Sequence, residues 1–169
     1  MKRLIILTIE IIICFLLQTT VFQWFSLGNV VPNLLLIVTV ASAFMHGQKE
    51  GLLVGFFCGL LVDFSFGNVI GMYAFIYMFV GYFNGYSNKI FDLNDMTVPI
   101  ILIGVSEFVY FFLYYVLEFL LRGKLNIFFY FTRIGLPEII YTVFISIFLY
   151  KLLILIDEHL VHIEEEEVY

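Results

Sequence analysis

Long apolar stretches fill most of this 169-residue chain, and short polar breaks separate one stretch from the next. An α-helix needs about 20 mostly apolar residues to cross the hydrocarbon core of a bilayer. The breaks divide the chain into six such stretches, at residues 4–27, 32–45, 51–66, 70–88, 97–121 and 134–156. The pattern therefore predicts an all-α integral membrane protein, built as a bundle of about six transmembrane helices.

The second and third predicted spans are short. They hold 14 and 16 residues, whereas a full crossing takes about 17–25. They are either short helices in a locally thinned bilayer or a re-entrant hairpin that the rest of the protein buries. Both alternatives leave the two chain termini on the same side of the membrane.

Composition agrees with a membrane as the solvent. Hydrophobic residues make up 63% of the chain and charged residues 13%, against about 45–50% and 25% in a soluble domain. These values exclude a free soluble domain and also a disordered chain. We expect one membrane domain at residues 1–156 and an acidic cytoplasmic tail at residues 157–169. The four consecutive glutamates near the end of the tail favour a solvated helical extension over a metal site with His159 and His162.

The first apolar stretch follows Lys2 and Arg3, as a signal peptide would, but Glu10 interrupts it and no small-residue cleavage site follows. We therefore expect a retained first helix. Basic residues favour the cytoplasmic side of a membrane. With both termini inside, five basic residues lie on the cytoplasmic side and three outside, and this bias predicts cytoplasmic termini; the two sets are Lys2, Arg3, Lys49, Lys89 and Lys151, and Arg122, Lys124 and Arg133.

Glycines recur every fourth residue in the third span, at Gly51, Gly55 and Gly59, and again at the following turn, at Gly67 and Gly71. Small residues at this spacing leave a shallow groove along a helix, so another helix backbone can approach closely. Packing within this one chain is the favoured interpretation. A docking face for the helix of a partner protein is the alternative.

Several acidic residues fall inside the spans, and an ionisable group at membrane depth is a functional-site hypothesis by default. Asp63 follows Gly59 by four residues, and either it has a functional role or it reaches the interface and caps the next turn. Glu107 lies deeper in the fifth span, and Arg133 is the basic residue that we predict as its ion-pair partner.

The first span also carries a weakly polar stripe. Glu10, Cys14 and Gln18 recur every fourth residue and so share one helix face, which we expect to contact protein rather than lipid. Cys14 and Cys58 both lie in apolar stretches, and we expect them to be small packing residues rather than a disulfide.

Known catalytic patterns are absent from the sequence. It has no His/Asp/Ser set, no HExxH, no P-loop and no dinucleotide-binding glycine fingerprint. All three histidines lie outside the spans, which argues against a proton relay through the acidic residues. We predict a non-enzymatic protein with no catalytic, cofactor or metal site and no nucleic-acid partner.

Several short motifs resemble, in their order and spacing, the MreD family of rod shape-determining proteins. The proline-asparagine-leucine step at Pro32-Asn33-Leu34 is followed by the Gly55 to Asp63 glycine motif. A glycine-aromatic step and a few single positions in the last two spans complete the resemblance, at Gly71, Tyr73, Glu107, Phe108, Arg133 and Pro137.

The resemblance implies a non-enzymatic, multi-pass protein of the bacterial cytoplasmic membrane that works with the bitopic protein MreC in cell-wall elongation. It implies further links to MreB filaments, a glycan polymerase and a penicillin-binding transpeptidase. The family's fold is also similar to that of the substrate-binding subunits of energy-coupling-factor vitamin transporters.

That similarity suggests an alternative function, as a membrane-embedded substrate-binding subunit of a small-molecule transporter. Such subunits resemble one another in an Ala-x-x-x-Ala patch that contacts their energising partner. This chain has only Ala41, Ala43 and Ala74, and no two of them have that spacing. The scaffold function is therefore favoured.

Overall fold

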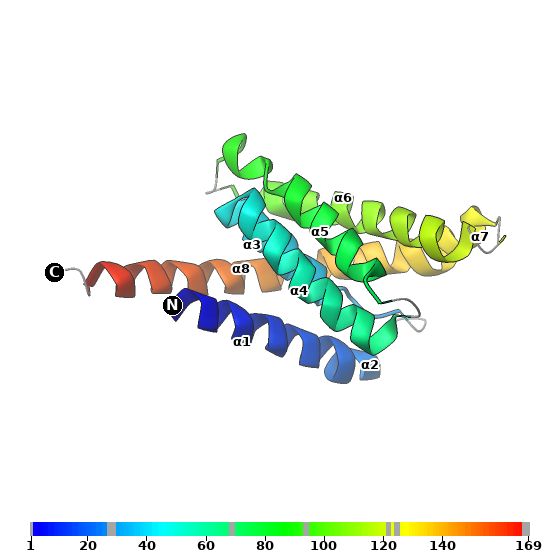
Figure 1. Cartoon of the computed structure of the whole chain (residues 1–169), viewed down its shortest axis with the longest axis horizontal. Coiled ribbons are helices and arrows are strands. Elements are labelled where there is room, and N and C mark those ends of the chain that lie inside the picture. Colours follow the sequence, from blue (N-terminus) through cyan, green and yellow to red (C-terminus); the bar gives the residue numbers. More distant parts are fainter. Residues whose placement is uncertain are drawn as a thin grey trace.

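The computed structural model describes residues 2–26, 30–67, 70–92, 95–120, 123 and 126–166, with side chains for all of these except residues 2, 120 and 160–166. This part of the chain is all-helical and forms a bundle of six helical rods (Figure 1). The predicted fold class is confirmed. Arg122 and Lys124, which contribute to the predicted orientation, lie outside the described residues.

The three long rods each contain one π-helical turn, where the backbone winds more widely than in an α-helix. The first rod comprises α1 (Lys2–Leu16), a π turn (Leu17–Val21) and α2 (Phe22–Trp24). The fifth comprises α6 (Thr97–Tyr114) and a π turn (Tyr115–Leu120). The last comprises α7 (Ile127–Tyr130), a π turn (Phe131–Gly135) and α8 (Leu136–Glu166).

The three middle rods are α3 (Leu34–His46), α4 (Gln48–Phe66) and α5 (Met72–Asn84), which a short 3₁₀ turn (Ser87–Lys89) follows. The expectation that the second and third spans are both short is corrected in part. Helices α3 and α5 have 13 residues each, but α4 has 19. The polar residues before Gly51 are already helical, because the chain turns at Gly47 alone, where φ is +91°.

Helix α3 lies at the centre of the bundle. It contacts α1, α4, α5, α6 and α8. Leu35, Leu36, Ile37 and Val38, which follow one another around the helix at about 100° each, are all 0% exposed. A helix that is apolar on every side is stable only when other elements surround it. Its short length is therefore compatible with its place, since its neighbours rather than lipid cover it.

The long outer rods carry apolar side chains on their exposed surfaces. Three helical segments are long and apolar enough to cross a membrane, Arg3–Trp24, Thr97–Phe119 and Ile127–His159, within the described part of the chain. Ile101 and Phe148 are 60% and 66% exposed. An outer surface of this kind needs lipid as its solvent.

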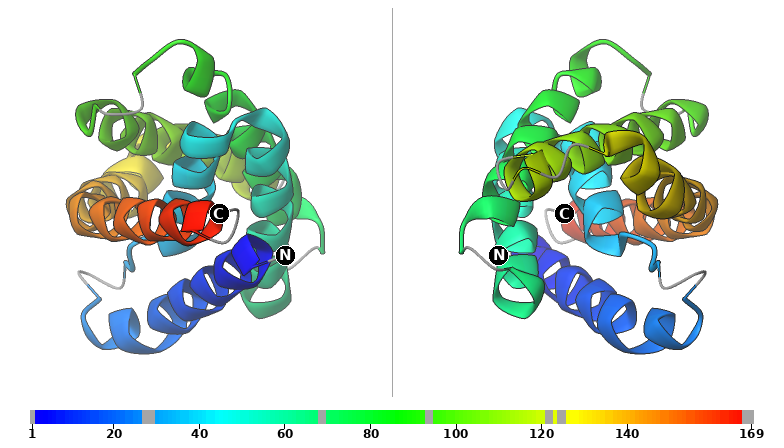
Figure 2. Two further views of the ribbon diagram at one scale, coloured as in Figure 1. Left: turned by 90° about the vertical axis from the view of Figure 1, so that its left-hand side faces the viewer. Right: turned by 90° about the vertical axis from the view of Figure 1, so that its right-hand side faces the viewer.

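The beginning of α1 and the end of α8 lie at the same end of the bundle (Figures 1 and 2). The end of α3 and the beginning of α4 are there too, since His46 contacts Asp157 and Arg3 contacts Glu50. We call this end the termini end. The opposite end holds the beginnings of α3, α5 and α8.

Candidate functional sites

The glycine row of α4 is closed against the chain's own helices. A Cβ added at Gly51, Gly55 or Gly59 would lie under 3.0 Å from atoms of α3 or α5, mostly backbone atoms. Gly81 of α5 faces the carbonyl of Gly51 in the same way. The predicted sites therefore come together as a backbone-to-backbone contact between α4 and α5, and this contact leaves no open groove along the row.

Asp63 binds the beginning of α5. Its carboxylate accepts hydrogen bonds from the backbone N–H groups of Gly71, Tyr73 and Ala74 at 3.0, 3.0 and 2.9 Å, and it is 2% exposed. The first N–H groups of a helix have no partner within the helix, and the helix dipole favours a negative charge there. Of the two predicted roles, the structure therefore shows the cap: Asp63 binds the first N–H groups of α5.

The turn between α4 and α5 completes this cap. Gly71 has φ of +100°, a left-handed conformation that costs glycine little and other residues more. Nothing lies within 4 Å of a Cβ placed there, so backbone conformation and not packing requires the glycine. At Gly67, an added Cβ would meet the backbone of Asp63.

The beginning of α3 is buried in the bundle, and side chains supply its hydrogen bonds. Asn33 Oδ1 accepts from the backbone N–H of Leu36 at 3.2 Å, and Gln18 Oε1 accepts from Leu35 N–H at 3.1 Å. The same Asn33 oxygen accepts from the hydroxyl of Tyr77 at 2.6 Å. Asn33 is thus the N-cap of α3, and buried Pro32 precedes the cap rather than standing in the first helical turn.

A polar cavity of about 220 Å³ adjoins this helix beginning. We call it the polar cavity. Three tyrosines, three side-chain amides and one carboxyl line it together with apolar residues; these polar lining residues are Gln18, Gln23, Asn33, Tyr73, Tyr77, Tyr110 and Glu138. Each tyrosine comes from α5 or α6, and Glu138 comes from α8. Gln18 and Gln23 come from the first rod, and Val62 and Phe66 of α4 complete the lining. The cavity therefore lies where all six rods meet, at the end opposite the termini.

Glu107 of α6 is buried next to this cavity. It is 1% exposed, and neither of its carboxyl oxygens has a hydrogen-bond partner among the described residues. The predicted ion pair with Arg133 is wrong. Arg133 is exposed, and its guanidinium lies 5.9 Å from the ring centre of Phe129. A long basic side chain near a helix beginning reaches outward more easily than into a packed interior.

Pro137 has a local role in the last rod. The N–H of Leu136 donates to the carbonyl of Phe131, five residues back, which is the wide π turn. Proline has no N–H and cannot donate to the preceding turn. The wide turn and the proline therefore occur together, immediately before Glu138.

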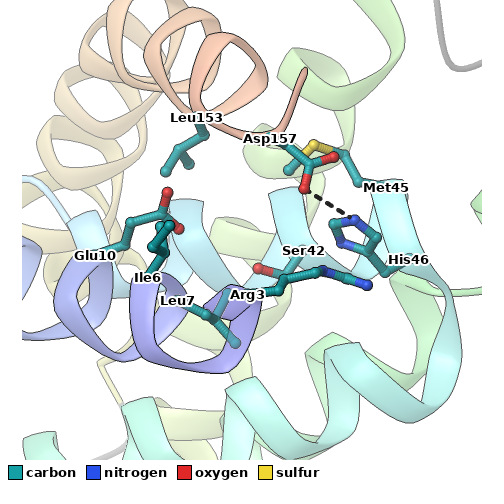
Figure 3. Close-up of a pocket in the computed structure, with 9 residues that line it drawn as sticks. All are labelled: Arg3, Ile6, Leu7, Glu10, Ser42, Met45, His46, Leu153 and Asp157. Atoms are coloured by element: carbon teal, nitrogen blue, oxygen red, sulfur yellow. Dashed lines mark ion pairs between the residues drawn. The ribbon is translucent and has the colours of Figure 1, made fainter. Parts of the chain in front are cut away.

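At the termini end, ionisable groups from four rods meet. Figure 3 shows those of α1, α3 and α8. Arg3 Nη2 lies 2.6 Å from each carboxylate oxygen of Glu50. His46 Nδ1 lies 3.1 Å from Glu50, and its Nε2 lies 3.2 Å from Asp157. Beside them is a cavity of about 20 Å³, room for roughly one water molecule. Glu10 points into this region toward α8.

These contacts shift the ionisation of Glu50, which lies in the polar segment outside the spans. Burial acts to raise the pKa of its carboxyl, but the hydrogen bond and charge of His46, together with the guanidinium of Arg3, outweigh burial and lower it. Glu50 is therefore a carboxylate at neutral pH. The cluster ties α1, α3, α4 and α8 together by charge.

An open apolar groove runs between α1 and α4. Its volume is about 780 Å³, and we call it the α1–α4 groove. Leu53 and Phe57 of α4 are both 56% exposed in it. The paired Arg3 and Glu50 lie at its termini end. The predicted polar stripe of α1 faces elsewhere, since Cys14 is 4% exposed and Gln18 binds α3, which confirms that this stripe contacts protein.

Sequence reasoning missed several residues of these sites. Tyr77 and Gln23 line the polar cavity, and a polar residue within an apolar span was the available signal for both. His46 joins the cluster at the termini end, although it lies outside the spans. Asn88 was missed too, although its amide donates to the last carbonyls of α3, at 2.7 and 2.8 Å.

These features define a small helical membrane protein in which buried polar groups hold the ends of short central helices. The chain belongs to the MreD family, because the family model described as rod shape-determining protein MreD matches residues 1–157. Membership gives the protein a role in rod-shape determination. The same comparisons found no match among the curated proteins or the solved structures. The expected similarity in fold to vitamin-transporter subunits therefore stays a prediction.

Proposed function

We propose that this protein is a non-enzymatic scaffold subunit of the cell-wall elongation machinery in the bacterial cytoplasmic membrane. It crosses that membrane several times with both termini in the cytoplasm. It docks the single transmembrane helix of an MreC-type protein, and through that partner it is linked to the glycan polymerase, the penicillin-binding transpeptidase and MreB filaments. Family membership supports the general role.

The α1–α4 groove is the observation that carries the docking step. It is apolar, it is open, and it runs between two helices with exposed side chains along both walls. In lipid, helices associate through close packing rather than through the hydrophobic effect. A transmembrane helix seated in this groove would bury Leu53 and Phe57 in such packing.

The glycine row contributes indirectly to this docking. Gly51, Gly55 and Gly59 fix α4 against α5 from its other side. Because they set the position of α4, they set one wall of the groove. A partner helix thus docks on the face of α4 that the glycines do not use.

A groove-filling variant tests the proposal. Leu53→Trp places an indole in the groove, and we expect it to reduce co-purification of an MreC-type partner at least about tenfold, as a clash of about 1.4 kcal/mol or more would. The measurement is pull-down of the tagged protein from membranes in mild detergent. Cells that depend on the variant should become round.

Leu152→Trp is the matched control. Leu152 of α8 is 54% exposed, close to the 56% of Leu53, and lies outside the groove. We expect this variant to retain the partner. If Leu53→Trp folds with an unchanged melting temperature and still retains the partner like Leu152→Trp, the groove is not the docking site.

A further inference from the structure

The polar cavity has the composition of a ligand site. We propose that it binds a small organic cation, a primary or quaternary ammonium compound. This proposal is independent of the scaffold function, and it rests on three properties of the cavity: its space, its charge and its aromatic walls.

The space is sufficient for a small molecule. The cavity holds about 220 Å³ and is partly open at the end of the bundle opposite the termini. A water molecule needs only about 10–15 Å³ by the same kind of measure. An open polar space of this size can admit a small organic molecule.

An acidic side chain, and no basic one, lines the described part of the cavity. Glu138 lines it, and no lysine, arginine or histidine is among its lining residues in the described part of the chain. Glu107 interacts electrostatically with Glu138 and Tyr77, which both line the cavity. The Glu107 carboxyl is 1% exposed and lies beside Asn33 and Glu138, and burial without a counter-charge disfavours a carboxylate. A cation in the cavity would favour the carboxylate form of Glu138 and, at longer range, that of Glu107.

The walls suit an organic cation rather than a metal ion. The rings of Tyr77 and Tyr110 stand at 80° to each other with centroids 5.7 Å apart, and Tyr73 lies 6.3 Å from Tyr110. All three tyrosines line the cavity, and the face of a tyrosine ring attracts an ammonium group through the ring quadrupole. Calcium needs about six to eight oxygen ligands and magnesium a near-octahedral shell, and two carboxyls with amides do not provide such a shell.

Two of the three amide side chains that line the cavity are engaged by α3. Asn33 and Gln18 already use their oxygens on the N–H groups of α3. Their role toward a ligand is then limited to positioning the cavity wall. The attractive groups that remain are the two carboxyls and the three tyrosine rings, and these all favour a positive charge.

Calorimetric titration of the full-length protein in a maltoside detergent tests the proposal. The probe is choline chloride, and its neutral isostere 3,3-dimethylbutan-1-ol is the control ligand, because it has the same shape without the charge. We expect saturable choline binding with a Kd of about 1 mM. The isostere should bind at least about tenfold more weakly, since it lacks the cation–π and carboxylate attraction.

Two variants locate the binding. Glu138→Gln and Glu107→Gln each keep the side-chain shape and remove one acid, and each should weaken choline binding at least about tenfold. Glu158→Gln, on an exposed position of α8 outside the cavity, should bind choline like the unchanged protein. Melting temperature of each variant without ligand shows whether it is folded.

Several results would overturn the proposal. These are absence of saturable heat with choline, equal binding of the isostere, and unchanged affinity in both folded cavity variants. The Leu53→Trp variant separates this idea from the scaffold function, because it alters the α1–α4 groove and should keep choline binding. Loss of partner docking there with normal choline binding leaves the cavity proposal intact.

Discussion

Single polar side chains hold the ends of the short central helices. Asn33 and Gln18 accept from the first N–H groups of α3, and Asn88 donates to its last carbonyls. The carboxylate of Asp63 accepts from the first N–H groups of α5. A buried helix end leaves backbone groups that neither water nor lipid can satisfy. These residues are therefore needed for folding before any role in partner binding is considered.

Removal of the Asp63 carboxylate should destabilise the protein strongly. Asp63→Ala leaves three N–H groups without their partner, each at a cost of about 1–3 kcal/mol if buried. A loss of at least about 2 kcal/mol corresponds to a fall in melting temperature of roughly 4 °C or more. Thermal unfolding in detergent, followed by circular dichroism, measures it.

Asp95→Ala is the comparison at an exposed hydrogen bond just before α6. Asp95 accepts this bond from the N–H of Thr97 at 2.9 Å. Its loss should cost about 0.5–1.5 kcal/mol. Equal melting temperatures for the two variants would contradict the structural role assigned to Asp63.

Among the elements, the α4–α5 pair is the closest contact. Its glycines bring the two backbones together so tightly that a Cβ at Gly55 would meet the carbonyl carbon and oxygen of Tyr77 and the amide nitrogen of Met78. Backbone atoms cannot turn aside as a side-chain end can. Any side chain at Gly51, Gly55 or Gly59 would therefore push α4 away from its neighbours.

The substitution Gly55→Ala should lower stability by about 1–3 kcal/mol, the usual cost of overpacking. Gly104→Ala in α6 is the matched control, since its Cβ would meet only the end of Val143, at 3.2 Å. There the better helix propensity of alanine, worth about 0.8–1 kcal/mol, offsets the contact. Melting temperatures that fall equally for both variants would show that the row is no tighter than other contacts.

The elements were largely predictable from the apolar pattern, and the sites were not. Six stretches became six rods, and the glycine spacing marked a real close contact. The error over α4 arose because Gln48 to Glu50 are polar yet helical. The Glu107–Arg133 pair was wrong because a linear sequence does not show which way each helix is turned.

The polar cavity shows the same limit more sharply. Its polar lining comes from α1, α3, α5, α6 and α8 or the segments beside them, and no two of these residues form a motif. Each polar residue alone has an ordinary explanation. Only the packing angles of the helices bring Gln18, Tyr77 and Glu138 around one space.

For the whole molecule, the charged cluster at the termini end determines how rods distant in sequence stay together. Arg3, His46, Glu50 and Asp157 come from α1, α3, α4 and α8. The first and last rods are thereby joined to α3 and α4, which Gly47 connects. Helices α1 and α8 are thus held at one end by the side-chain contacts of Arg3 and Asp157 and along their length by packing.

This cluster should make stability depend on acid pH. The pKa of Glu50 in the folded protein lies below its ordinary value of 4.5, so its carboxylate stabilises the fold above that pH. The stabilisation is lost as pH falls through the lower, folded-state pKa. Between pH 6 and about pH 3, the melting temperature of Glu50→Gln should therefore fall less than that of the unchanged protein.

Glu158→Gln serves as the control for that titration, since it is exposed on α8 near Asp157 and has no described contact with the cluster. Its melting temperature should follow the pH curve of the unchanged protein. A Glu50→Gln curve identical to both would show that the cluster does not contribute to stability.

The shortness of α3 has an electrical consequence. Thirteen residues at about 1.5 Å each span roughly 20 Å, while the hydrocarbon core is about 30 Å thick. Water in the polar cavity would bring the aqueous phase to the beginning of α3. The membrane voltage would then fall mainly over the length of α3 and not over the full thickness of the bilayer. The field is then steeper there, by roughly half, and a charge that enters the cavity moves through part of a potential worth about 2.3 kcal/mol per 100 mV.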